Sequence, residues 1–96
     1  MDTLIKDLAE RIQKVKDPET ERLLSESNII LEIVRVDDGT IRIVYSPTSP
    51  ASPVAVDLGR RILKAASDAV PSFKVQVVCR GHLLDDLVNR LLNQSP

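Results

Sequence analysis

Aromatic residues are scarce in this chain, where they make up 2% of the 96 positions, as Tyr45 and Phe73. Proteins that bind single-stranded nucleic acid stack bases on aromatic side chains, and this sequence offers almost none. An excess of charge of one sign is also lacking, because 13 Lys and Arg nearly balance 14 Asp and Glu and leave a net charge of −1. We therefore expect no nucleic acid and no anionic membrane surface among the partners.

Cysteine is equally scarce, since Cys79 stands alone, and this excludes an internal disulfide and an intrachain cysteine cluster. A single reduced thiol is typical of a cytoplasmic protein. No apolar run approaches the ~20 residues of a membrane span, and no apolar segment of signal-peptide type stands near Met1. The hydrophobic content of 43% is enough for one aliphatic core. We predict a single cytoplasmic domain over residues 1–96, without a cofactor.

The chain is organised around residues 45–59, which read YSPTSPASPVAVDLG. A residue before proline prefers extended backbone and proline fixes its own φ, so the three Ser-Pro pairs predict a stiff loop. Ser52 is placed to cap the helix that follows, with a proline at the first helical position. The same design recurs at Asp17-Pro18, where Glu19 falls in the first turn of a short helix predicted over residues 17–25.

Apolar periodicity predicts the remaining elements. In chain order, the predicted helices and strands are residues 4–15 (capped by Asp2 or Thr3), 17–25, 29–36, 40–45, 53–69, 73–79 and 83–92. The fold class is therefore α/β (α+β), a two-layer α-β-β-α-β-α domain whose three-stranded mixed sheet carries its helices on one face. The apolar stripes of the last two helices are Ala55, Leu58, Ile62, Ala65, Ala66 and Ala69, then Leu83, Leu84, Leu87, Val88, Leu91 and Leu92. Gly59 inside the first stripe predicts a close approach to the sheet.

The loop Asp37-Asp38-Gly39 joins the first two strands and sets their register. Both a two-residue Asp38-Gly39 turn and a three-residue loop with Gly39 in the left-handed region fit it. We favour the three-residue loop because it gathers apolar residues on one face, namely Ile29, Leu31, Ile33, Ile41, Ile43 and Tyr45. The reverse face then carries Ile30, Val34, Val44 and Val78, a patch that predicts a homodimer or partner docking through the open sheet face.

This topology brings several polar residues to one rim of the sheet, where the second and third strands end and the first begins. The residues expected there are Asp17, Glu19, Thr48, Ser49, Ser52, Cys79 and His82. Asp17 and Ser52 are explained as helix caps, and Glu19 as a surface acid. Cys79 shares the face of the apolar strand residues, which predicts a buried, inert thiol. Cys79 and His82 alone are too few to indicate a metal site.

The loop YSPTSPASP before a helix, together with Asp17-Pro18-Glu19, resembles the small iron–sulfur-assembly domains of the SufT and PaaD type. The resemblance runs over roughly residues 4 to 79, and that family also includes the cytosolic iron–sulfur targeting factors. Its members carry a cysteine just before the helix, at the position that Ser52 occupies here. A serine hydroxyl stays protonated near neutral pH and is a poor ligand for a soft metal.

The resemblance implies a non-enzymatic accessory or adaptor protein of iron–sulfur cluster assembly or metalloprotein maturation, which meets protein partners of that process through the rim. The alternative is a binding or structural module of the same fold that has lost the metal role and binds a small anion at Ser49–Pro53. An enzyme is not expected, because a Ser-His-Asp hydrolase would need a nucleophile elbow that the sequence lacks.

Overall fold

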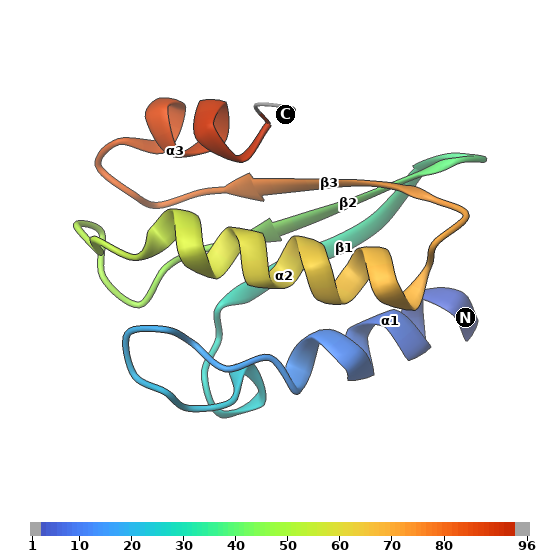
Figure 1. Ribbon diagram of the computed structural model, residues 1–96, viewed down its shortest axis with the longest axis horizontal. Helices are drawn as coiled ribbons and strands as arrows, with labels where there is room; N and C mark the ends of the chain where they lie inside the picture. Colours follow the sequence, from blue (N-terminus) through green and yellow to red (C-terminus); the bar gives the residue numbers. More distant parts are fainter. Residues whose placement is uncertain (1–2, 94–96) are drawn as a thin grey trace.

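The structure, a computed structural model, describes residues 3–93 (Figure 1). Its elements are α1 (Thr3–Gln13), a 3₁₀ turn η1 (Leu24–Glu26), β1 (Ile30–Asp37), β2 (Thr40–Tyr45), α2 (Ala55–Ala69), β3 (Lys74–Cys79) and α3 (Asp85–Leu92). The strands form one sheet in the order β1-β2-β3, with β2 antiparallel to β1 and parallel to β3. The α+β class and the mixed sheet are thus confirmed. Asp2, one of the two predicted caps, lies outside the described residues, and Thr3 is already helical.

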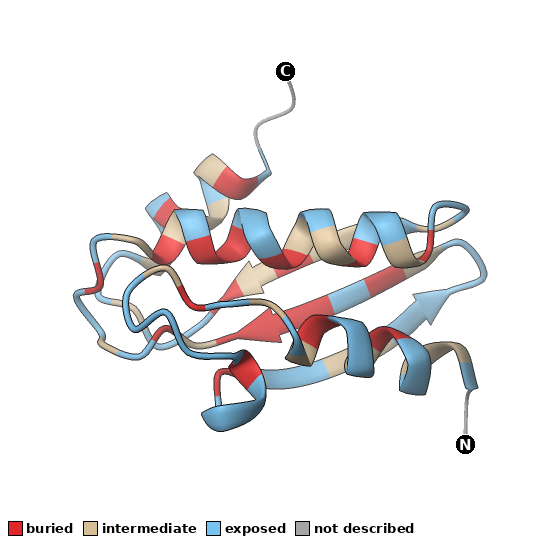
Figure 2. Ribbon diagram, turned by 60° about the horizontal axis from the view of Figure 1, so that its bottom comes forward, coloured by how far each residue is buried: buried red, intermediate tan, exposed pale blue. Residues whose placement is uncertain are grey.

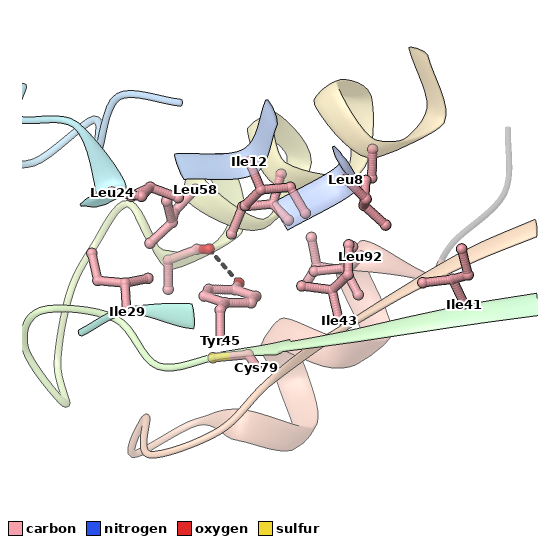
Figure 3. Close-up of a cluster of buried hydrophobic side chains, with 14 of the residues drawn as sticks. Leu8, Ile12, Leu24, Ile29, Ile41, Ile43, Tyr45, Leu58, Cys79 and Leu92 are labelled. Carbon is pink, nitrogen blue, oxygen red and sulfur yellow. Dashed lines mark hydrogen bonds between the residues drawn. The ribbon is translucent and has the colours of Figure 1, made fainter. Parts of the chain in front are cut away.

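Within the described part of the chain, α1 and α2 lie on one face of the sheet, as predicted, whereas α3 lies beside the free edge of β3 and packs against α2 (Figures 1 and 2). Their buried side chains join those of β2 in a single core, which Figure 3 shows in part. Its largest buried members are Leu8, Ile12, Leu24, Ile41, Ile43, Tyr45, Leu58, Ile62 and Cys79. Burial of one such aliphatic side chain stabilises a fold by about 1.5–3 kcal/mol. None of the described helices combines the length and the apolar character that crossing a bilayer requires.

The short helix predicted from Asp17 is wrong. The carbonyl of Asp17 accepts from the Glu21 N–H at 2.7 Å, which closes one helical turn. Glu21 then adopts φ 60°, in the left-handed region, and the helix cannot continue through it. The chain instead folds back so that Lys16 pairs with Leu23 as an isolated bridge.

The β1–β2 hairpin differs from its prediction at the turn but not in the middle. Asp37 pairs with Thr40, so the turn has two residues, and Gly39 has no positive φ. One extra residue on β1, Val36, then shifts the register, and Ile33 pairs with Ile43 as the three-residue loop predicted. The bulge therefore restores the apolar alignment that the turn alone would lose.

A second register shift, at Leu31, overturns part of the predicted outer face. Beyond it, Ile30 pairs with Tyr45 and packs against the core, while Leu31, predicted in the core, is 52% exposed. Val44 is buried rather than exposed, and Val34 and Val78 are half-buried. The open apolar patch predicted on this face is thus much smaller than expected.

The last two helices begin two residues later than predicted, at Ala55 and Asp85. The stripe of α2 is confirmed in its buried members Ala55, Leu58, Ile62 and Ala66, whereas Ala65 and Ala69 are half-buried. The predicted apolar stripe of the last helix is only partly confirmed. Val88 and Leu92 are buried, but Leu83, Leu84 and Leu87 are 76%, 57% and 45% exposed.

Gly59 lets α2 approach its neighbours, as predicted. A methyl group at this position would lie 2.6 Å from the Tyr45 hydroxyl and 2.7 Å from a Leu92 methyl, both far inside van der Waals contact. The Tyr45 hydroxyl is fixed there because it donates to the Ala55 carbonyl at 2.6 Å (Figure 3). Residue 59 therefore sits where α2, α3 and β2 meet.

Candidate functional site

Three loops meet where β2 and β3 end, at the left edge of Figure 1: residues 16–23, 46–54 and 80–84. We call this edge the rim. Backbone hydrogen bonds tie the loops to the strands and to one another. The Ser46 N–H donates to the Ile29 carbonyl at 2.8 Å, and the Leu83 N–H donates to the Pro50 carbonyl at 2.8 Å. The rim is thus a connected structure in which the predicted residues lie close together.

Asp17 is buried at the rim and bridges two of its loops. One carboxylate oxygen accepts from the Glu19 N–H at 2.8 Å, and the other accepts from the Thr48 hydroxyl at 2.8 Å. Its predicted role as a helix cap is therefore replaced by that of a tether between residues 16–23 and the Ser-Pro loop. Glu19 itself is exposed, as predicted for a surface acid.

We expect Asp17→Ala to lower the free energy of unfolding by about 1–3 kcal/mol, because it removes the acceptor of two hydrogen bonds in a buried place. Urea denaturation followed by circular dichroism measures the change. Glu19→Ala, two residues away but exposed, is the matched control and should stay within about 0.5 kcal/mol of the natural protein. Equal stability of both variants would contradict the tether.

Two serine hydroxyls of the Ser-Pro loop accept hydrogen bonds from backbone N–H groups of the same loop. The Ser52 hydroxyl accepts from the Val54 N–H at 3.3 Å, just before α2, so it orders the approach to a helix that begins later than predicted. The Ser49 hydroxyl accepts from the Ala51 N–H at 3.3 Å. Because the Asp17 carboxylate lies beside Thr48 in the same loop, the arrangement disfavours the anion predicted at residues 49–53.

His82 joins the second and third loops of the rim. Its Nδ1 accepts from the Leu84 N–H at 2.9 Å, so the proton of the neutral ring sits on Nε2. Nε2 then donates to the Ser52 carbonyl at 3.0 Å. The ring is half-buried, and both of its nitrogens are engaged in hydrogen bonds. His82 therefore links residues 80–84 to residues 46–54, and neither ring nitrogen is free to bind a metal.

Cys79 is buried beneath Tyr45, as predicted (Figure 3). Burial raises the pKa of its thiol to about 11, the Asp85 charge adds to the rise, and the contact with the Tyr45 hydroxyl opposes it. The thiol lies 3.7 Å from an Asp85 carboxylate oxygen. The Asn89 amide pairs with the Cys79 backbone, accepting from its N–H at 2.6 Å and donating to its carbonyl at 3.1 Å. The thiol is thus protonated at neutral pH and is no ready metal ligand.

Asp85 is the rim residue that sequence reasoning missed. Its carboxylate accepts from the His82 N–H at 2.8 Å and from the Gly81 N–H at 3.2 Å, and so shapes the loop into α3. The sequence did contain a signal for this role. Asp85 follows His82 by three residues, and in a capping box the acid three residues after the cap accepts from the backbone N–H of the cap residue. Within residues 3–93, no group of three or more His, Cys, Asp and Glu side chains is placed to hold a metal ion.

Comparisons with known proteins agree with this geometry. The family described as "Iron-sulfur cluster assembly protein" matches residues 5–78. The crystal structure of a domain of unknown function, DUF59, from Bacillus anthracis is similar, with a TM-score of 0.72. That match covers 80% of this chain and 74% of that chain at 19% sequence identity, which shows a common fold. No curated protein sequence matches the chain.

Proposed function

The chain belongs to the iron–sulfur cluster assembly protein family, and we propose that it acts there as a non-enzymatic accessory or adaptor protein, not as a carrier of the cluster. One observation supports this proposal: Ser52 is buried, and its hydroxyl accepts from the Val54 N–H. On the resemblance, this is the position where the SufT and PaaD type carries its cysteine, and that correspondence belongs to the proposal. The assignment to that subtype, and to the cytoplasm, is part of the proposal.

The remaining potential ligands support the same proposal. Cluster ligation takes about four cysteines, or two cysteines with two histidines. One chain offers Cys79, whose thiol is buried, and His82, whose two ring nitrogens are engaged. Even a homodimer, which stays a prediction, would supply only two of each. A protein of this kind serves assembly by contact with other proteins, for which the rim offers exposed Glu19, Thr48 and Leu83.

We expect the natural protein to retain substoichiometric iron and sulfide after anaerobic reconstitution with both and desalting. Ser52→Cys should retain more iron, because a thiol before the N-terminus of α2 has a lowered pKa and becomes a thiolate. Ser49→Cys in the same loop is the matched control and should not gain iron. Stoichiometric iron and sulfide in the natural monomer would refute the proposal.

The partner side of the proposal has its own test. Glu19→Arg combined with Leu83→Glu changes two exposed rim side chains without touching the buried network. In pull-downs from the native cell, this variant should recover less of any iron–sulfur assembly protein that the natural chain captures. Lys64→Glu, exposed on α2, is the control for a change of surface charge. Capture that the rim variant leaves unchanged would exclude the rim as the contact.

A further inference from the structure

A groove with a volume of about 370 Å³ lies on the outer face of the sheet, which is on the far side of Figure 1. It is lined by Arg42 of β2, by Gln76, Val78 and Arg80 on and after β3, and by Asn93 after α3. Its charged lining consists of two guanidinium groups, and no acid belongs to it. Of these residues only Arg80 belongs to a rim loop, and its side chain takes no part in the rim hydrogen bonds described above.

The two arginines are exposed and available. Within residues 3–93, neither forms an ion pair. The Nε of Arg42 donates to the Gln76 side-chain oxygen at 3.4 Å, which leaves its terminal nitrogens open to a ligand. Glu32 of β1 lies on the same face, diagonal to Arg42 in the strand register, but does not line the groove.

The strand register sets how the two cations can cooperate. Arg42 pairs with Gln76, and Arg80 stands four residues further along the same strand direction. At ~3.3 Å per residue along the strand and ~4.8 Å between strands, the Cα atoms of Arg42 and Arg80 lie about 14 Å apart, with Val78 between them. Two guanidinium groups at this separation, over an aliphatic floor, suit an extended ligand that carries more than one carboxylate. Arg pairs with carboxylates through two parallel hydrogen bonds.

We propose that the groove between Arg42 and Arg80 binds an acidic segment of a protein partner, with both guanidinium groups paired to its carboxylates. A segment is favoured over a small free anion because the site is open. An exposed ion pair changes a binding constant by only about two- to fivefold, so one small anion would be held weakly. Several carboxylates on one chain engage both arginines together and add their effects.

The test uses a fluorescein-labelled oligoglutamate peptide and fluorescence anisotropy at low ionic strength. The natural protein should bind, and added salt should weaken binding because the charges are exposed. The double variant Arg42→Gln/Arg80→Gln should lose about tenfold in affinity. Thermal unfolding checks that this variant is folded, as expected from its two exposed positions.

The control variant is Arg60→Gln/Lys64→Gln, which removes two exposed cations from α2, on the other face of the sheet. It should bind the peptide as the natural protein does. If both double variants lose the same affinity, binding depends only on the net charge of the protein and the proposal is wrong. It is also wrong if the natural protein does not bind the peptide.

Citrate is the second probe. If citrate binds as tightly as the peptide and shifts the same backbone amide signals in NMR spectra, the ligand is a free carboxylate, and the proposal of a protein segment is wrong. The outcome does not depend on the iron measurements above.

Discussion

Gly59→Val is expected to lower the free energy of unfolding by about 3 kcal/mol, the upper end of the range for overpacked cores. The first added carbon alone would lie 2.6 Å from the Tyr45 hydroxyl, which its hydrogen bond to Ala55 holds in place. Domains of this size have a total stability of about 5–15 kcal/mol, so the loss is large. Urea denaturation measures it. Ser67 is exposed on the same helix, so Ser67→Val measures the effect of the lower helix propensity of valine alone. It should lower the free energy of unfolding by less than about 1 kcal/mol.

The cause of the Gly59 effect can be separated from a general loss of packing. Gly59→Ala should still destabilise, although alanine gains about 1 kcal/mol in helix propensity. Tyr45→Phe removes the hydroxyl that the new methyl would strike. In a Tyr45→Phe background, Gly59→Ala should therefore cost less than it does in the natural protein. Strictly additive effects would mean that the clash with Tyr45 is not the reason.

The Cys79 thiol is expected to react at least about 100-fold more slowly with a disulfide reagent at mildly alkaline pH than the same thiol in the denatured chain. The rise of its pKa from 9.0 to about 11 reduces the thiolate fraction by about that factor, and burial restricts access further. Because the folded state holds this proton more tightly than the unfolded state, its contribution to stability is complete below about pH 9. That contribution is then lost as the pH rises towards about 11.

A variant with its thiol at the rim provides the reaction rate with which the rate of Cys79 is compared. Cys79→Ala/Ser49→Cys moves the chain's one thiol to the rim, where Ser49 is half-buried. This variant should react at a rate near that of an unfolded thiol. If the natural protein reacts equally fast, Cys79 is accessible as a thiolate, and the argument against its use as a metal ligand falls.

The rim could be predicted from the sequence because it depends on few facts. The hairpin makes β1 antiparallel to β2 and the helical crossover makes β3 parallel to β2, so these two connections fix which strand ends meet and place the loops of Asp17, Ser52 and His82 at one edge. What those side chains bind could not be predicted. Asp17 fits a helix cap locally, but the contact with Thr48, 31 residues away, belongs to the tertiary structure.

The errors in the strands and in α3 have a common physical origin. Local patterns specify that a side chain is apolar, but not whether a neighbour arrives to cover it. One extra residue at Leu31 exchanged the positions of Ile30 and Leu31 relative to the core, and a hydrophobic pattern cannot reveal such a bulge. The contacts of α3 with β3 and α2 cover Val88 and Leu92 but leave Leu87 exposed, and Leu84, just before this eight-residue helix, is exposed as well.

Asn89 also determines how this sheet can meet other chains. Its side-chain amide offers the Cys79 backbone the donor and acceptor that a fourth strand would offer, so strand addition at this end of the β3 edge is blocked. On the opposite edge, the extra residues at Leu31 and Val36 interrupt the flat ladder that an incoming strand needs. Both edges thus resist edge-to-edge aggregation. Where strand addition is blocked in this way, a partner approaches through side chains, at the rim or on a face, and the chemistry of those side chains selects among partners.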